Sequence, residues 1–201
     1  MNDTIELASL TAAFKAITKM LAEPFDDDVN RPTPCPGWDV STLFDHVIDL
    51  VIRMADRAGV TMTDQSYMTP QQRLAAVTEP SLEGWRCRQG IHGEIVWRDR
   101  RLPDRVAIKV LALDIVVHGW DLAVALDRTL DIADPYVDYL LEFARGALTD
   151  DVRATSGFRE PVFGYGHGVT MLERLVAFTG RDPQHWNVAA HKSALSHSSD
   201  T

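Results

Sequence analysis

Residues 106–126 read VAIKVLALDIVVHGWDLAVAL, an apolar run with a carboxylate at Asp114 and an imidazole four residues later at His118. On a helix, two side chains four residues apart lie one above the other on a single face. The rest of that face is apolar: Ala107, Leu111, Leu122 and Ala125. We therefore expect a buried helix face, on which an ionised carboxylate must be paired or bound to a metal.

The composition suits one soluble domain with a real core, since 45% of the 201 residues are hydrophobic. The formal net charge of -9 argues against nucleic acid or an anionic membrane surface as a partner. No apolar stretch is long enough to span a bilayer, and the N-terminus lacks a signal-peptide pattern. The two cysteines, Cys35 and Cys87, form neither a CxxC site nor a disulfide framework, which favours a reducing cytoplasm.

Periodic apolar residues predict four long helices and several shorter elements. The long helices are expected at residues 3–21, at 39–58 with Asp39 as N-cap, at 103–125 and from Asp134 onward. Shorter helices are expected at 71–77 and 171–178, and a short strand or hairpin arm at 91–98. This order predicts a mainly all-α fold, a four-helix bundle with a long crossover between the second and third long helices. Residues 1–186 are expected to form one domain, followed by a disordered tail at 187–201.

A metal site is one explanation for the buried carboxylate. His46 lies beside the apolar stripe of the second long helix and is the natural third ligand to join Asp114 and His118. Two imidazoles and one carboxylate suit zinc foremost, with nickel, iron or cobalt as alternatives. Three protein ligands leave coordination positions open, as in catalytic metal sites.

Ordinary pairing in the core is the other explanation. His118 could form a structural pair with Asp121, or Asp121 could meet His46. Asp121 could also orient a ligand imidazole by accepting its hydrogen bond, or lie solvated on the helix surface. Asp114 itself could pair with one of three cations: Arg53, Arg57 or Lys109. Spacing alone leaves metal and core pairing equally open, because D-x-x-x-H is short and frequent by chance.

Three stretches of the chain resemble a known family. They are TPCPGWDVSTLFDHVI at residues 33–48, ALDIVVHGWDLAVAL at 112–126 and LERLVAFTGRDP at 172–183. Together they resemble the mycothiol-dependent maleylpyruvate isomerase family, in the DinB-like metal-binding four-helix superfamily. The resemblance spans about residues 10–183 and implies the DinB-like bundle.

The resemblance also implies a metal site and a chemistry. His46 corresponds to the family's first ligand, Asp114 falls where a Glu is common, and His118 corresponds to the final ligand. Enzymes of this family place a small thiol on the metal, so the resemblance implies a thiol-dependent transferase or isomerase. Its partners would be a small thiol such as mycothiol and a small electrophile, and the superfamily is compatible with a homodimer.

The substrate stays open, because the isomerases carry a C-terminal domain for which this sequence has no room after Pro183. Maleylpyruvate is therefore not expected. A non-enzymatic metal-binding or sensory module is the alternative function.

Two other residues are candidate functional groups. Cys35 could be a reactive thiol, but no base is evident near it in the sequence, and a buried structural cysteine is commoner. His167 lies in a glycine-rich stretch and could approach the mouth of the bundle, although a solvated loop histidine is expected. The glycines at 164–168 follow no clear strand, so nucleotide binding is not expected.

Overall fold

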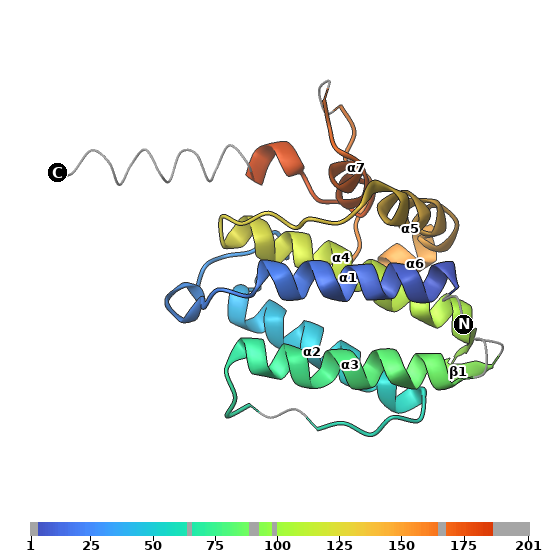
Figure 1. Ribbon diagram of the computed structural model, residues 1–201. Coiled ribbons are helices and arrows are strands. Elements are labelled where there is room, and N and C mark those ends of the chain that lie inside the picture. Colours follow the sequence, from blue (N-terminus) through green and yellow to red (C-terminus); the bar gives the residue numbers. More distant parts are fainter. Residues whose placement is uncertain (1–3, 64–65, 89–92, 98–99, 165–167, 187–201) are drawn as a thin grey trace, which may run out of the picture.

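Helix α4 (Asp104–Ala125) contains the apolar run and is buried along most of its length. It packs against α1 (Ile5–Met20) and α2 (Val40–Arg57), and α5 (Asp134–Ala147) and α7 (Met171–Phe178) also contact it (Figure 1). A helix that is apolar on all sides needs such neighbours to remove it from water. The central position of α4 explains how Asp114 and His118 come to lie inside the molecule.

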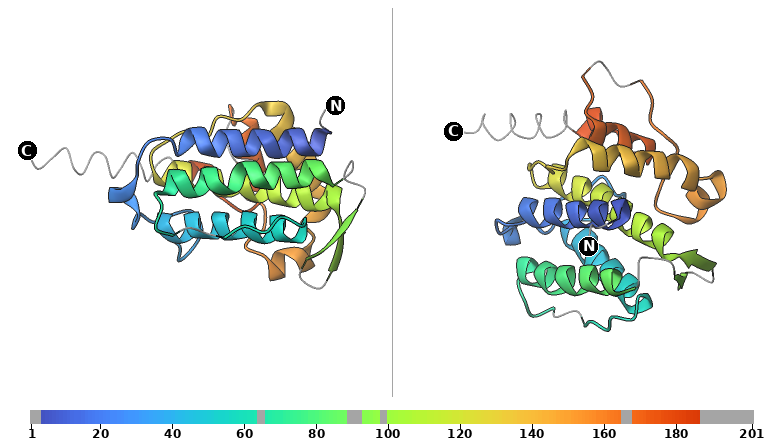
Figure 2. Two further views of the ribbon diagram at one scale, coloured as in Figure 1. Left: turned by 60° about the horizontal axis from the view of Figure 1, so that its bottom comes forward. Right: turned by 45° about the vertical axis from the view of Figure 1, so that its right-hand side comes forward.

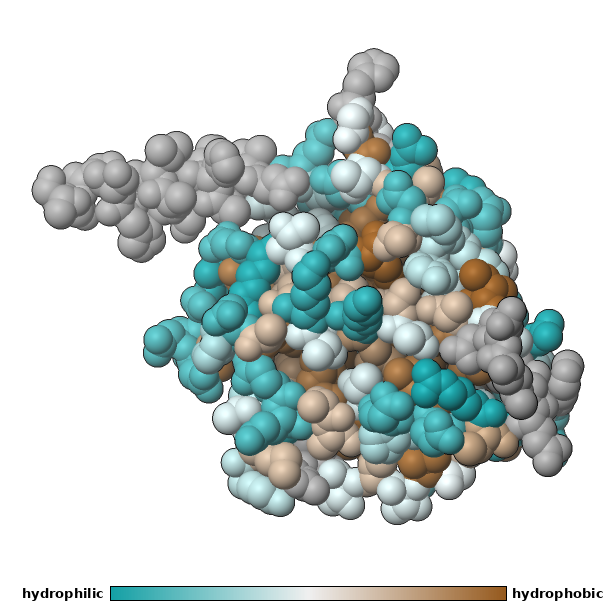
Figure 3. Space-filling model, in the orientation of Figure 1, coloured by the Kyte–Doolittle hydropathy of each residue, from teal (hydrophilic) through white to brown (hydrophobic). Residues whose placement is uncertain are grey.

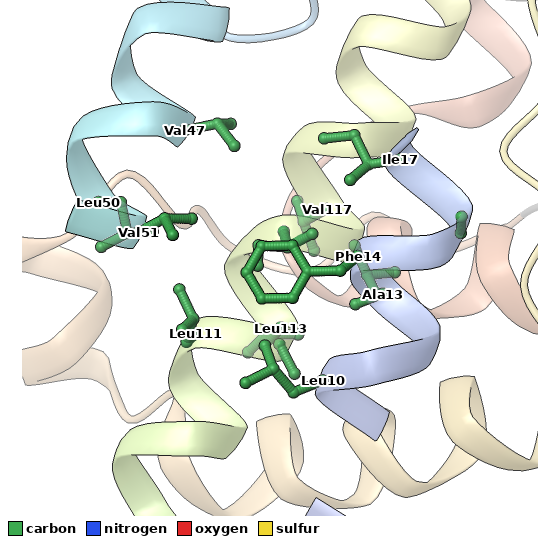
Figure 4. Packing of buried hydrophobic residues seen from close by; sticks show 14 of the residues in the cluster. Leu10, Ala13, Phe14, Ile17, Val47, Leu50, Val51, Leu111, Leu113 and Val117 are labelled. Carbon is green, nitrogen blue, oxygen red and sulfur yellow. The ribbon is translucent and has the colours of Figure 1, made fainter. Parts of the chain in front are cut away.

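A ring of four helices forms the bundle. Helix α3 (Pro70–Cys87) packs against both α2 and α1, and so closes the ring that runs α1–α4–α2–α3 (Figure 2). Inside it, the Phe14 ring of α1 lies between residues of α2 and α4 (Figure 4). The interior side chains labelled there include Leu10, Ile17, Val47, Val51, Leu111 and Val117. The part of the core in this view is therefore aliphatic around the Phe14 ring.

The structure, a computed structural model, describes residues 4–63, 66–88, 93–97, 100–164 and 168–186. Over these residues the chain is mainly helical with one short antiparallel hairpin, which confirms the predicted fold class. The remaining elements are η1 (Asp26–Asp28), β1 (Glu94–Trp97), β2 (Arg100–Pro103) and α6 (Asp150–Thr155). The predicted tail at 187–201 and His167 lie outside the described residues.

Helix α3 is much longer than the segment 71–77 that the sequence predicts. A capping box starts it: the Thr69 side chain accepts from the Gln72 N–H, and the Gln72 side chain accepts from the Thr69 N–H. Pro80 and Gly84 in its second half lower the local helix propensity. The sequence therefore does not predict a helix in this half. Burial of Leu82 and Trp85 against the bundle outweighs that penalty. The segment predicted as part of the crossover therefore supplies a full bundle helix.

The surface agrees with the acidic, charged composition. On the face in Figure 3, hydrophilic side chains surround small apolar areas. In the described part of the chain, no helix combines the length and the apolar character that crossing a membrane requires.

Candidate functional site

A tight loop before α2 holds two residues of the site, Cys35 and Trp38. The Thr33 N–H donates to the Trp38 carbonyl at 3.1 Å, and the Thr33 hydroxyl accepts from the Cys35 N–H at 3.2 Å. Gly37 takes a φ of +79°, a left-handed conformation that favours glycine and lets the loop turn. Asp39 then caps α2 as predicted, since its carboxylate accepts the Thr42 N–H at 2.8 Å. The cap and the turn fix the loop beside α4.

Two imidazoles from facing helices lie edge to face beside this loop. The rings of His46 on α2 and His118 on α4 are 5.1 Å apart between centroids, at an interplanar angle of 86°. The Trp38 indole lies 4.8 Å from the His46 ring and 6.4 Å from the His118 ring. The Trp38 indole therefore has two imidazole neighbours.

The three predicted metal ligands line one pocket of about 1130 Å³. His46 enters it from α2, and Asp114 and His118 enter it from neighbouring turns of α4. The apolar face around Asp114 is buried as expected, but Asp114 itself is only partly buried because it opens onto the pocket. The structure thus brings the three residues to one cavity, and metal binding by them stays a prediction.

The charge of the pocket is opposite to that of the whole chain. Asp114 is the only acidic residue among its lining residues, whereas four arginines line it: Arg53, Arg100, Arg153 and Arg159. Its apolar walls come from the hairpin, α5 and the segment after α6, with Trp97, Phe143 and Phe158 as the aromatic members. The pocket therefore suits a small organic molecule with a negatively charged group.

A buried network lies behind His118. The Asp121 carboxylate has no exposed surface. It accepts hydrogen bonds from Nε and Nη2 of Arg181, at 3.2 and 2.8 Å. His118 Nδ1 lies 3.1 Å from Asp121 Oδ2, and Cys35 Sγ donates to the same oxygen at 3.3 Å. Arg181 Nη2 is also 3.4 Å from Cys35 Sγ. Each member of the network therefore touches at least two others.

Burial and charge set the protonation of this network. Burial alone would raise the pKa of Asp121, but the Arg181 guanidinium and His118 outweigh it, and the pKa falls below its ordinary value. Burial and the neighbouring Asp121 carboxylate raise the pKa of the Cys35 thiol to about 12, although Arg181 acts in the opposite direction. At neutral pH the network thus holds a carboxylate, a guanidinium and a protonated thiol.

Donor atoms of Cys35, His118 and Asp121 all lie within 4.8 Å of one another, so this cluster could also hold a metal ion. His118 therefore belongs to two sets of donors. One faces the pocket with His46 and Asp114, and the other lies behind it in the buried network.

The structure corrects one expectation about Cys35, shows which partner Asp121 has and adds Arg181 to the site. No base was evident near Cys35, yet Asp121 and His118 lie 3.3 and 3.7 Å from its sulfur atom. Of the alternatives for Asp121, the structure shows the pair with His118, at 3.1 Å, and not a solvated helix surface. Arg181 is buried with Asp121 and was not predicted, because no periodic pattern marks a residue that follows a helix end.

Two of the three cations that could pair with Asp114 also have other contacts. Arg53 forms an ion pair with Asp49 at 2.9 Å, and the Lys109 ammonium lies 4.8 Å from the centroid of the Phe143 ring. Arg53 also lines the pocket that contains Asp114, so a pair between them stays a prediction, as does a pair of Asp114 with Arg57 or Lys109.

Fold and site define a helical-bundle protein with a histidine-containing pocket between α2 and α4. Residues 10–86 match the family described as the mycothiol maleylpyruvate isomerase N-terminal domain, which confirms the predicted resemblance over this part of the chain. The matched range contains Cys35 and His46, whereas Asp114, His118 and Asp121 follow it.

Two uncharacterized proteins from two strains of Mycobacterium tuberculosis are similar to the chain, each 26% identical over 124 residues. The match covers 60% of this chain and 66% of each relative, so it spans just under two thirds of their length. No solved structure matches the chain.

Proposed function

We propose that the chain binds a divalent transition metal, zinc foremost, through His46, Asp114 and His118, and uses it to activate a small thiol. The reaction would be transfer of that thiol to a small electrophile, or a thiol-dependent isomerisation. The observation that carries the proposal is the convergence of the three residues from two facing helices on one pocket. The family match supports a thiol of the mycothiol type as partner.

The donor set fits the proposed metal. Two imidazoles and one carboxylate suit zinc, nickel, iron or cobalt, and three protein donors leave a coordination position for an exchangeable ligand. A bound metal of this kind would favour the thiolate form of a thiol ligand. Asp114 would supply the one negative charge among the three donors, which reduces the cost of holding a cation in the pocket.

The chain's own residues would do the rest of the work. Asp121 lies within hydrogen-bond distance of His118 Nδ1 and so restrains the imidazole. Arg100 and Arg159 at the pocket wall would bind a negatively charged group of the electrophile. Trp97, Phe143 and Phe158 would bury its apolar part. These contacts would orient the electrophile toward the thiol.

The buried cluster favours a second candidate, a non-enzymatic metal-binding or sensory module. In it, Cys35, His118 and Asp121 would hold a metal ion away from the pocket, and the ion would mainly fasten the N-terminal loop to α4. Such a site would offer no exchangeable position to a thiol.

Metal content separates the candidates. Untagged protein is expected to carry one metal ion per chain by elemental analysis, and to lose it in His46→Ala, Asp114→Asn and His118→Ala. His185→Ala serves as the matched control, because His185 is exposed and absent from the lining residues of the pocket. Full metal content in both the His46 and the Asp114 variant would refute the proposed ligand set.

Thiol binding then tests the chemistry. Metal-loaded protein is expected to bind mycothiol in calorimetry, and the His46→Ala variant is not. A metal-loaded protein that binds no thiol and turns over no member of an electrophile panel would support the sensory module instead. A reducing cytoplasmic setting also belongs to the proposal, since Cys35 and Cys87 are both free thiols. A homodimer stays a prediction.

A further inference from the structure

The bonding around Asp121 is already complete without a metal. Oδ1 accepts from Arg181 Nε, and Oδ2 has three neighbours: Arg181 Nη2, His118 Nδ1 and the Cys35 thiol. The carboxylate is fully buried, so these four contacts satisfy its hydrogen-bonding capacity in place of water. A cation at this position would have to displace some of them.

The charge of Arg181 opposes a cation in the same place. Its guanidinium is only 6% exposed and lies 2.8 Å from Asp121 Oδ2 and 3.4 Å from Cys35 Sγ. A metal ion bound to Asp121 and Cys35 would therefore face a fixed positive charge that solvent screens poorly. Arg181 thus already serves as the counter-ion of the carboxylate.

The turn after α7 aims Arg181 into the bundle. Gly180 takes a φ of +91°, its N–H donates to the Ala177 carbonyl, and the Arg181 N–H donates to the Val176 carbonyl. These two bonds and the left-handed glycine make a Schellman motif, which fixes the direction of the chain where the helix ends. The guanidinium also donates to the Thr179 carbonyl at 3.2 Å.

We infer that Cys35, Asp121 and Arg181 are positioning residues that keep His118 in the tautomer with the proton on Nδ1. Nε2 is then the ring nitrogen left for the pocket that His46 and Asp114 also line. The inference rests on the proposed function in one respect: the reason to leave Nε2 unprotonated is that it would bind the proposed metal. The tautomer itself is a property of the metal-free protein, and it can be measured whether or not a metal binds.

Nitrogen-15 long-range correlation spectra of the metal-free protein test the tautomer directly. In mildly alkaline buffer, His118 is expected to give the Nδ1–H pattern, identified by its loss in His118→Gln. Asp121→Asn keeps the shape of the side chain and removes its charge, and it should shift His118 toward a mixture of tautomers. The exposed His185 should give the same spectrum in both proteins. A wild-type His118 with the proton on Nε2 would overturn the inference.

Cobalt substitution tests the competing role of Cys35 as a ligand. Positioning predicts no thiolate-to-cobalt charge-transfer band, and an unchanged metal content in Cys35→Ser. A charge-transfer band, or loss of metal in this variant, would overturn the inference and assign the metal to the buried cluster. If no metal binds at all, the proposed function fails, and the tautomer spectrum alone decides the inference.

Discussion

The Asp121 carboxylate is removed from solvent, and it depends on Arg181 for its only full counter-charge in the described structure. The pair joins α4 to the segment after α7, 60 residues apart in sequence. Breaking a buried pair from one side is expensive because the remaining charge stays buried without compensation. The polar network behind the pocket should therefore matter to folding as well as to the site.

Arg181→Met is expected to lower the free energy of unfolding by about 3–5 kcal/mol, because it leaves the buried Asp121 carboxylate without its counter-charge. Urea denaturation followed by circular dichroism measures the change. Arg174→Met on α7 is the control, since Arg174 is exposed and its loss should change stability by less than about 0.5 kcal/mol.

Adding Asp121→Asn to Arg181→Met should recover part of the loss, because the double variant contains no stranded charge. Equal stability of Arg181→Met and the wild type would contradict the role given to this pair.

Sequence spacing could predict the site only where its residues share one helix. Asp114 and His118 are one turn apart on α4, and their relation follows from helix geometry. The helix pattern only suggested His46, and the family resemblance supported it, because the facing of two helices is a tertiary contact. The contact between Cys35 and Arg181 spans 146 residues through a loop and a helix end, so no local period encodes it.

At the scale of elements, helix starts were predictable and one helix length was not. Asp39 caps α2, Pro135 lies in the first turn of α5, and α7 spans the predicted residues 171–178. Helix α3 was underestimated because Pro80 and Gly84 weaken the local signal, whereas tertiary packing decides the outcome. Gly84 also lies too close to Val60 for a larger side chain to fit.

Gly84→Ala is expected to destabilise the protein although alanine is the better helix former. The added methyl group would overlap Val60 Cγ2, and overpacking typically costs about 1–3 kcal/mol. Gly146→Ala on α5 is the matched control, since nothing lies within 4 Å of its methyl position, and it should stabilise by up to about 1 kcal/mol. Chemical denaturation of both variants measures the two signs, and equal shifts would refute the close approach of Val60.

At the scale of the whole molecule, the apolar core holds the bundle together, and core residues such as Leu50 and Leu113 also line the pocket. The core packs α1, α2, α3 and α4 together through buried apolar side chains, without help from the predicted ligands. A metal should therefore add to the stability of a chain that folds without it.

Chelation is expected to lower the melting temperature and leave the helical circular dichroism at low temperature unchanged. A ligand at about a thousand times its Kd stabilises the folded state by about 4 kcal/mol, which corresponds to roughly 10 °C for a chain of this size. His118→Ala should melt at one temperature with or without chelator. Loss of helical signal on chelation would instead indicate that the ion is needed for folding, as in a structural module.

Trp38 is close enough to the pocket for its fluorescence to respond to changes there. Its indole lies beside both imidazoles, 4.8 Å from one ring and 6.4 Å from the other. Protonation of either ring, or capture of an ion by it, alters the electric field at the indole and hence its emission. Because the chain has five tryptophans, the part of the emission that is lost in Trp38→Phe can therefore follow occupancy of the pocket in real time.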